Sequence, residues 1–556
     1  MNSYYVGLLI QASISIIAIT GIFALTGLAG MFSLGQAAYM AIGAYITFIL
    51  AAKTGLSFWI TSLGGIGACM LVAWLAAMPT VRLRKDYFSL ISVGLGQTIT
   101  ALLITFSDIT NGSQGFSKIP KVEHLLPLAL LVTALSIFCV RNLKYSRYGR
   151  MSIALKNDEL AAKSFGIDVY KLKIKVYILG SVIAGLAGIL YGLQNRVLLP
   201  ESFGWTASSE QEIFLFFGGT NSLTGAVISA ALLKCLPEFF RNVTLFGQSL
   251  QEYRTILYCI LILLIINFRP SGLMGEHELS FSRLRERLSG RRKKRRAAQM
   301  ADILLKTEHL SKSFGGVKAV QDFNMELHEG EVGGIIGPNG AGKTTIFNLL
   351  SHIYDYSEGR VTFLGRDITE SDQVQVARMG LSRTFQNTRL FAGLSVLDNV
   401  KVGLDQAGRY NLFEAMFLLP RRQREERRIA EEASRCLEVL NLSQHSGARP
   451  ANLPYGIQRR VEIARAIASR PRVLLLDEPA AGLNPEEVLA LIDFIRLIKE
   501  RFQLSILVIE HRMDLIMTLC DTIYVQDFGR TIAVGPPAKI QKDPAVLAAY
   551  LGEEEV

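Results

Sequence analysis

The chain has 556 residues, a net charge of +11 and a hydrophobic fraction of 50%. Its length predicts more than one folded core, and the hydrophobic fraction is high for a soluble enzyme. The six cysteines are scattered, without a Cys-x-x-Cys pair or a neighbouring histidine cluster. This pattern argues against a zinc site or a disulfide framework and predicts reduced core thiols. The average composition conceals a division, because long apolar runs dominate up to about residue 275 and the rest is ordinary globular sequence.

Apolar segments in the first half predict a polytopic α-helical membrane domain over residues 1–275. These segments lie near 6–27, 28–52, 57–78, 88–107, 125–140, 174–194, 211–236 and 255–268. Most of them approach the ~20 residues that cross a bilayer. One such segment alone fits a buried helix of a soluble core, but eight in series argue against a soluble protein. The first lacks a basic flank and a small-residue cleavage site, so we expect a retained membrane segment.

Positive charges in the loops orient the membrane segments. The loop 141–173 carries eight lysine and arginine residues and is therefore expected in the cytoplasm. The short basic loop 82–85 precedes it by two crossings and faces the same side. The C-terminal half, which carries the nucleotide motif described below, must also be cytoplasmic. Three apolar segments lie between these two cytoplasmic parts, so one of them must be split or re-entrant.

Glycine-rich interruptions occur in two of the apolar segments. The stretch 218–225 (Gly-Gly-Thr-Asn-Ser-Leu-Thr-Gly) divides the segment 211–236, and a similar stretch covers 27–36. Broken helices in corresponding halves of a transporter expose backbone groups to a polar or zwitterionic substrate. Close helix packing through small residues is the alternative. On the first reading, the translocation path is lined by Ser33, Gln36, Thr220, Asn221 and Ser222.

The basic loop also contains a charged amphipathic segment from Arg150 to Gly166. It is too charged to span a bilayer, so we expect one short cytoplasmic helix that ends at Gly166. A helix lying on the bilayer surface is the alternative. The pattern resembles the cytoplasmic loop by which ABC importer permeases dock on their ATPases. The residues that carry this resemblance are Glu159, Ala161, Ala162 and Gly166.

The resemblance extends over most of the membrane half. It rests on the stretches 28–45, 82–96, 146–167 and 268–275, which read LAGMFSLGQAAYMAIGAY, RLRKDYFSLISVGLG, SRYGRMSIALKNDELAAKSFGI and FRPSGLMG. These stretches are similar to the permease subunits of bacterial branched-chain (hydrophobic) amino-acid ABC importers. The resemblance implies a permease domain in the bacterial cytoplasmic (inner) membrane.

Residues 276–302 form a basic linker after the last apolar segment. It contains the run Arg291–Arg296, in which all six residues are basic. A nucleic-acid-binding arm is one reading of such a run. Its place beside a membrane helix favours anionic lipid headgroups, which attract such segments by about 1 kcal/mol per basic residue. We therefore expect membrane lipids, and no nucleic acid, as its partner.

A phosphate-binding pattern, G-x-x-x-x-G-K-T, stands between a strand-like apolar run and a helical run. It is formed by Gly337, Pro338, Asn339, Gly340, Ala341, Gly342, Lys343, Thr344 and Thr345. The glycines let backbone N–H groups turn towards a phosphate at a helix N-terminus. Lys343 then reaches the β- and γ-phosphates, and the hydroxyl of Thr344 holds Mg²⁺. We expect a nucleoside triphosphate to bind here.

Further polar side chains stand at the ends of predicted strands around this motif. The strand RVLLLDEP ends in Asp477 and Glu478, where one carboxylate can hold Mg²⁺ and the next can polarise water. Another strand delivers His511 towards a γ-phosphate, and Gln386 is placed to join the metal and the water. The ring of Phe314 is placed to stack on adenine, for about 1–3 kcal/mol. Each of these residues, taken alone, also fits a purely structural role. Their order and spacing around one P-loop favour a catalytic site.

The set resembles the ATPase domain of ABC transporters over residues 303–556, which implies an α/β P-loop NTPase fold. By this resemblance, residues 337–345 are the Walker A motif, and Gln386 belongs to the Q-loop. The resemblance also implies Asp477 as the metal carboxylate of Walker B, Glu478 as catalytic base and His511 as the switch histidine. Lys343 joins the catalytic set, and ATP with Mg²⁺, held by Thr344, Gln386 and Asp477, is the expected cofactor.

The signature motif of that family departs from its usual form in this chain. LSGGQ corresponds to Leu453–Ile457, of which Tyr455 and Gly456 are expected to contact nucleotide. Pro454 replaces serine and removes a hydroxyl and an N–H. Asn484 stands where the following D-loop usually has aspartate. Segment 409–434 adds an apolar cluster and a charged helix, for which we expect ordinary packing within a helical subdomain.

The resemblance implies a fusion of one permease subunit with one ATPase subunit of a branched-chain amino-acid ABC importer. In that family each ATP site is built by two chains. The expected partners are a second permease and a second ATPase, as separate chains or a second copy, with an extracytoplasmic substrate-binding protein. Two alternatives stay open: the same architecture importing urea, amides or small carboxylates, and an ABC exporter or remodelling ATPase.

We expect the two composite ATP sites to be unequal, because Pro454 weakens what this chain gives to its partner's site. The site that uses Lys343 should be at least as active as the other. Alanine substitution of Lys343 should therefore lower ATP hydrolysis more than substitution of the corresponding lysine in the partner. An equal loss from both substitutions would count against unequal sites.

Overall fold

The computed structural model describes residues 3–83, 85–239 and 303–551, together with scattered positions between 244 and 278. The chain divides into two compact units. One comprises Met1–Lys156, Val169–Arg287 and Asn411–Leu419, and the other Asn157–Asp168, Leu288–Tyr410 and Pro420–Val556. Each unit thus includes a short segment from the other half of the sequence. The predicted linker contact with lipid, and most of the apolar segment 255–268, fall outside the described residues.

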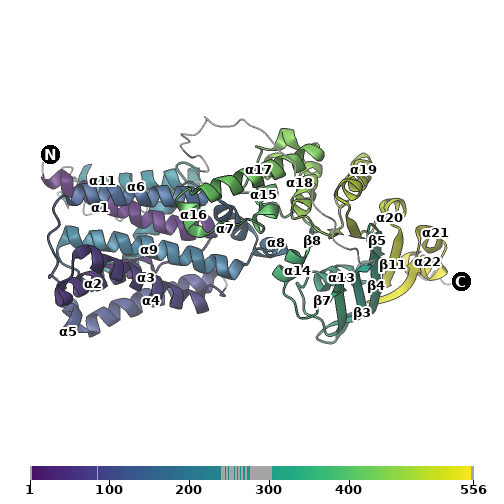
Figure 1. The fold of residues 1–556 in the computed structure, drawn as a ribbon, viewed down its shortest axis with the longest axis horizontal. Helices are drawn as coiled ribbons and strands as arrows, with labels where there is room; N and C mark the ends of the chain where they lie inside the picture. Colours follow the sequence, from purple (N-terminus) through teal and green to yellow (C-terminus); the bar gives the residue numbers. More distant parts are fainter. Residues whose placement is uncertain are drawn as a thin grey trace. The chain divides into compact units, whose positions relative to one another are not determined.

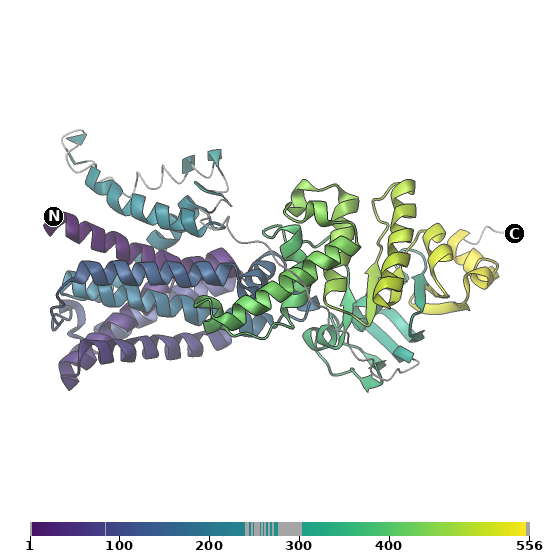
Figure 2. The same cartoon turned by 45° about the horizontal axis from the view of Figure 1, so that its top comes forward.

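Long apolar helices dominate the first unit, where they lie side by side (Figures 1 and 2). Among the described residues, six helices are long and apolar enough to cross a membrane. They are α1 (Ser3–Ile22) with its π-helical continuation η1 (Phe23–Leu28), α2 (Gln36–Thr54), α3 (Phe58–Thr80), α4 (Lys85–Thr105), α6 (Leu125–Lys144) and α9 (Val169–Asn195). The short segments are α5 (Ser107–Thr110), η2 (Gly112–Gln114), η3 (Pro200–Phe203), β1 (Thr244–Leu245) and β2 (Gln248–Ser249).

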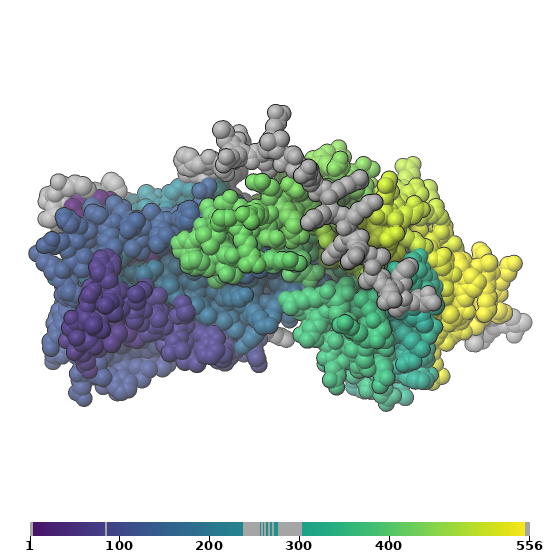
Figure 3. Space-filling view, viewed as in Figure 1, coloured from purple at the N-terminus to yellow at the C-terminus, as the bar shows by residue number. Residues whose placement is uncertain are grey.

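Helices α1, α2 and α9 form the centre of this unit. Their side chains are mostly buried, whereas α3, α4 and α6 expose large apolar residues such as Leu63, Leu90 and Leu131. An apolar outer surface is what a lipid-facing helix requires. Figure 3 shows one face of this unit, formed by segments coloured purple to blue.

The two predicted interruptions are present, and they contact each other. Residues 30–35 leave the helical conformation between η1 and α2. The second apolar segment is split into α10 (Trp205–Gly218) and α11 (Leu223–Phe239). A Cβ added to Gly27 would lie 2.9 Å from the carbonyl oxygen of Thr220, so the two breaks touch through backbone. The side chain of Lys156 donates hydrogen bonds to Gly27 O at 2.9 Å and to Asn221 Oδ1 at 2.8 Å.

Two sequence-based predictions about the cytoplasmic segments were wrong. The segment expected as one helix is two, α7 (Arg147–Asn157) and α8 (Glu159–Ser164). Asp158 separates them because its backbone is extended and its carboxylate accepts a hydrogen bond from Ala161 N, which caps α8. Helix α16 (Leu412–Met416) was expected to pack in the helical subdomain of the ATPase. It belongs instead to the first unit, where Asn142 Nδ2 of α6 donates to Met416 O at 2.8 Å.

The second unit is an α/β fold with two sheets. The larger has the order β12-β11-β5-β10-β9-β8. The strands β11, β5, β10, β9 and β8 are parallel, and β12 pairs with β11 in the antiparallel direction at the edge. Its strands are β5 (Val332–Ile336), β8 (Leu381–Arg383), β9 (Val473–Asp477), β10 (Ser505–Ile509), β11 (Thr522–Asp527) and β12 (Arg530–Gly535). The smaller is antiparallel, in the order β4-β3-β6-β7, formed by β3 (Ile303–Phe314), β4 (Val317–His328), β6 (Glu358–Phe363) and β7 (Arg366–Asp367). Burial of both faces explains the continuous apolar runs of β5, β9 and β10.

The remaining elements of this unit are helices and short turns. They are α13 (Lys343–Leu350), α14 (Gln373–Met379), α15 (Val396–Asp405), α17 (Pro420–Val439), α18 (Tyr455–Ala468), α19 (Pro485–Phe502), α20 (Met513–Leu519), α21 (Pro537–Ile540) and α22 (Pro544–Leu551), with the short turns η4 (Ser443–His445) and η5 (Pro450–Asn452). One core cluster joins the inner faces of both sheets, with Leu305, Ile335, Leu475 and Leu507 fully buried in it. The predicted fold class, a helical membrane domain followed by an α/β P-loop domain, is confirmed.

Close backbone contact between α2 and α9 gives a direct test of the membrane unit. A Cβ on Gly43 would lie 2.5 Å from Gly185 O and 2.7 Å from Gly185 Cα. We expect Gly43→Ala to lower the free energy of unfolding by about 1–3 kcal/mol, as overpacking does, measured by thermal unfolding of the purified chain. Gly67→Ala is the matched control, because no atom lies within 4 Å of its added Cβ. Equal melting temperatures for the two variants would contradict this packing.

Candidate functional site: a nucleotide pocket in the second unit

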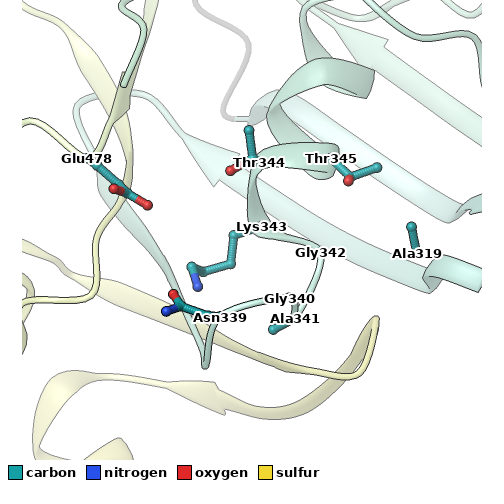
Figure 4. Close-up of a pocket in the computed structure, with 9 residues that line it drawn as sticks. All are labelled: Ala319, Asn339, Gly340, Ala341, Gly342, Lys343, Thr344, Thr345 and Glu478. Carbon is teal, nitrogen blue, oxygen red and sulfur yellow. The ribbon is translucent and has the colours of Figure 1, made fainter. Parts of the chain in front are cut away.

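The predicted phosphate loop joins strand β5 to helix α13 and lines a pocket with Glu478 and Ala319 (Figure 4). The loop backbone is left-handed at Gly340 and Gly342, with φ of 86° and 95°. A side chain at Gly342 would also place its Cβ 2.3 Å from Ala319 O. Glycine is therefore required there both for conformation and for space.

Lys343 begins helix α13, and its ammonium group donates hydrogen bonds to Gly337 O at 2.7 Å and Pro338 O at 2.8 Å. Burial lowers the pKa of Lys343 below its ordinary value, whereas the charge of Glu478 acts in the opposite direction. The two carbonyl groups hold the ammonium group beside the N-terminus of α13, where an anion is favoured. A phosphate is a stronger acceptor than a carbonyl group and would replace them as its partner.

The polar groups predicted from separate strands meet around Glu478. Its Oε2 accepts a hydrogen bond from Gln386 Nε2 at 2.8 Å, and His511 Nδ1 lies 3.9 Å from the same oxygen. Glu478 has a φ of 43°, which is unusual for a residue with a side chain and typical of strained functional positions. In Figure 4 the carboxylate of Glu478 and the side chain of Lys343 come from two different segments of the unit.

Asp477, at the end of β9, is buried beneath this site. Its Oδ2 accepts from Arg383 Nη2 at 2.8 Å, while Oδ1 has no hydrogen-bond partner among the described residues. Burial raises the pKa of Asp477 above its ordinary value, although the charge of Arg383 lowers it. Sequence reasoning missed Arg383, because the burial of its strand β8 is visible only in the structure.

Arg459 of α18 ties the catalytic segments together and was also missed. Its side chain is 1% exposed and donates five hydrogen bonds. Nη2 donates to Asp477 O at 2.8 Å and to Glu478 O at 2.7 Å. The other acceptors are Phe385 O, Pro479 O and Glu462 Oε2. One guanidinium group therefore fixes the backbone of the strand end, the Gln386 loop and the signature helix.

The signature residues lie at the start of helix α18. Pro454 is its N-cap, and Tyr455 is 39% exposed. Tyr455 and Gly456 are not among the residues that line the pocket. Asn484 caps α19 in a reciprocal pair with Glu487.

Phe314 lies outside the pocket lining. Its ring is 45% exposed at the end of β3 and packs edge-on against Tyr354, with 5.3 Å between ring centroids. The exposed face of this ring is what an adenine base would need for stacking.

Helix α8 and its flanks belong to the second unit, although they lie between membrane helices in the sequence. Asp158 Oδ2 pairs with Arg389 Nη1 at 2.7 Å. Gln373 Nε2 donates to Ser164 Oγ at 2.7 Å, and Arg378 Nε donates to Gly166 O at 3.0 Å. Of the predicted residues here, Ala161 and Ala162 are fully buried, whereas Glu159 pairs with Lys163 on the surface.

A continuous set of polar contacts links α8 to the backbone of Asp477 and Glu478. Glu462 is fully buried and accepts from Arg459 Nη1 at 2.8 Å and from Arg389 N at 3.3 Å. Arg465 donates to Arg389 O at 2.8 Å, and its guanidinium lies 4.5 Å from the ring centroid of Phe165. The path from Glu478 to Asp158 thus runs through Arg459, Glu462 and Arg389.

The predicted substrate-path residues lie at the two helix breaks of the first unit. Ser33, Gln36 and Ser222 are buried, Thr220 is half-buried and Asn221 is exposed. Both amide atoms of Gln36 lack a hydrogen-bond partner within the part of the chain that the structure describes.

Comparison with known families agrees with this division. Residues 4–266 match the family of branched-chain amino acid transport system permease components, and residues 320–481 match the ABC transporter family. Residues 530–556 match the family of branched-chain amino acid ATP-binding cassette transporters.

Individual relatives match the second half of the chain. The high-affinity branched-chain amino acid transport ATP-binding protein LivG of Salmonella typhimurium is 41% identical over 254 residues, which are 46% of this chain and all of LivG. BraF of Pseudomonas aeruginosa is 40% identical over the same shares. A solved ATP-binding cassette of an ABC transporter in its ADP conformation is 32% identical. It covers 45% of this chain and 99% of its own, with a TM-score of 0.40.

The fold and the pocket define an ATP-binding cassette that hydrolyses ATP, joined in one polypeptide to a polytopic membrane domain. The chain belongs to the family of branched-chain amino acid ABC transporters, and it combines a permease component with an ATP-binding component.

The hydrogen bonds of the buried Arg459 guanidinium group lead to a prediction about ATP hydrolysis. Arg459→Lys removes the forked donors to Asp477 O and Glu478 O, and hydrogen bonds from a charged group contribute about 1.5–3 kcal/mol each. We expect kcat for ATP hydrolysis to fall at least about tenfold, with a smaller change in KM, because the phosphate loop is not altered. Steady-state ATPase assays of the assembled transporter measure both constants.

The neighbouring Arg460→Lys is the control. Arg460 is half-buried and lies over the ring of Phe494, at 4.8 Å from its centroid, so it should keep near-normal activity. Similar kcat values for the two variants would contradict the role of Arg459.

Proposed function

We propose that this chain is one permease–ATPase half of an importer that uses ATP to bring branched-chain or other hydrophobic amino acids into the cell. The observation that carries the proposal is the position of α8. This helix lies between membrane helices in the sequence, yet it folds as part of the ATPase unit. Its contact with Arg389 is linked through Glu462 and Arg459 to Glu478.

In the proposed site, Lys343 and the phosphate-loop N–H groups hold the β- and γ-phosphates of ATP. Glu478 orients and polarises the attacking water, while Gln386 and His511 position that carboxylate and the γ-phosphate. Thr344, Gln386 and Asp477 fit a Mg²⁺ ion, because they supply only oxygen ligands and Asp477 Oδ1 lacks a partner among the described residues. The metal would neutralise charge on the phosphates.

A second ATPase is required, because one Walker A motif and one signature do not complete a site in this family. The exposed ring of Tyr455 and the neighbouring Gly456 are proposed to contact nucleotide held by the partner. A second permease, as a separate chain or as part of a second copy, would complete the pathway. An extracytoplasmic binding protein would deliver the amino acid to this complex in the bacterial inner membrane.

The proposal is tested by ATP hydrolysis in proteoliposomes that contain the full chain and its partner subunits. Binding protein loaded with leucine should stimulate hydrolysis above the basal rate. Asp158→Asn should retain basal hydrolysis but weaken this stimulation roughly fivefold, because a half-exposed ion pair contributes about 1 kcal/mol. Asparagine still caps α8 through its side-chain oxygen, so the variant removes the charge and not the helix.

Glu159→Gln is the matched control for this experiment. It removes a neighbouring charge whose partner, Lys163, lies on the same helix, and its stimulation should be near normal. If no substrate-loaded binding protein stimulates ATP hydrolysis, the proposed import function is refuted. Normal stimulation of Asp158→Asn would refute coupling through this pair.

A further inference from the structure

A buried carboxylate in the membrane unit, Glu212, was not predicted from the sequence for either the ATP site or the translocation path, although it contacts Ser33 of that path. It lies on α10, next to the second helix break, and its side chain is 2% exposed. Glu212 Oε1 accepts a hydrogen bond from Thr26 Oγ1 at 2.7 Å and from Ser33 N at 3.4 Å. Ionisable residues inside membrane segments are costly and are retained mainly for function.

Several polar atoms around Glu212 lack hydrogen-bond partners among the described residues. They are Glu212 Oε2, Gln211 Oε1, and both Oε1 and Nε2 of Gln36. Gln36 is fully buried, and Gln211 is 8% exposed. Leaving a buried polar atom unpaired is unfavourable, and such groups are rare in folded proteins. Four of them in one region therefore indicate a site for a polar ligand.

The register of α2 and α10 brings these side chains to one place. Ser208 Oγ, one turn before Glu212 on α10, accepts from Ala37 N at 3.0 Å. Gln211 Nε2 contacts Met40 Sδ at 3.2 Å. Met40 is one turn after Gln36 and shares its face of α2. The first turn of α2, which follows the first break, thus faces the segment of α10 that carries Gln211 and Glu212.

We propose that Glu212, Gln36 and Gln211 form a binding site for the primary ammonium group of an α-amino acid. Three unpaired acceptor atoms match the three N–H donors of an ammonium group, and the carboxylate of Glu212 supplies the opposite charge. The one unpaired donor, Gln36 Nε2, lies at the N-terminus of α2, which favours the carboxylate of the same ligand. The site rests on the proposed import of amino acids and assigns a zwitterionic substrate class to it.

A neutral amide or urea would not require the charge of Glu212, so ligand chemistry provides the test. The full transporter, purified in detergent without binding protein, is unfolded thermally with leucine, leucine amide or 4-methylpentanoate. A ligand that binds the folded state raises the melting temperature. Leucine and leucine amide, which carry the ammonium group, should raise it by a few degrees, and 4-methylpentanoate should not.

Glu212→Gln keeps the size of the side chain and removes its charge, so the shift with leucine should be lost. Glu210→Gln is the matched control. Glu210 lies on the same helix, is paired with Lys234 at 3.4 Å and is partly exposed, so its variant should keep the shift. Gln36→Leu provides a second variant if Glu212→Gln does not fold. It removes an unpaired polar group, so it should be at least as stable without ligand and still lose the shift.

A melting shift that is equal for leucine and 4-methylpentanoate would overturn the site. So would an undiminished leucine shift in both Glu212→Gln and Gln36→Leu. Failure of the proposed function is a separate result, in which no binding protein supports leucine uptake although the ammonium-dependent shift persists. Uptake with binding protein but without any ammonium-dependent shift would overturn the site alone.

Discussion

The guanidinium group of Arg459 is the interaction on which the ATPase unit depends. A buried charge is strongly unfavourable unless acceptors surround it, and Arg459 meets this condition through four backbone carbonyls and one carboxylate. These acceptors belong to the end of β9, the Gln386 loop and α18. The position of Glu478 is therefore set by the same group that holds the signature helix. A movement of α18 therefore also affects the carboxylate of Glu478.

Much of the nucleotide pocket could be predicted from sequence, because its functional groups belong to short motifs of consecutive residues. The phosphate loop and the pair Asp477–Glu478 follow buried strands, whose parallel ends meet at one edge of a sheet. Arg459, Arg383 and Glu212 could not be found in this way. Their importance arises from partners that are distant in the sequence, and burial of a charge is visible only after folding.

In the membrane unit, too, local features could be predicted from the sequence and long-range contacts could not. Glycine-rich stretches predicted both breaks, since glycine favours interruption locally. Local amphipathicity nevertheless suggested one helix where Asp158 separates α7 from α8, and it gave no sign that α16 packs with α6. The two breaks touch through Gly27 and Thr220, and Lys156 bonds to both. Lys156 lies two residues before Asp158, so the chain itself links the breaks to α8 by a short covalent path.

The central claim is that ATP hydrolysis in one half of this polypeptide drives an amino acid inward through the other. The most direct measurement is uptake of radiolabelled leucine by proteoliposomes that enclose ATP, with binding protein outside. We predict that leucine accumulates inside above its external concentration, and only when ATP and binding protein are both present. Hydrolysis of the enclosed ATP without such accumulation, whichever amino-acid binding protein is supplied, would contradict it.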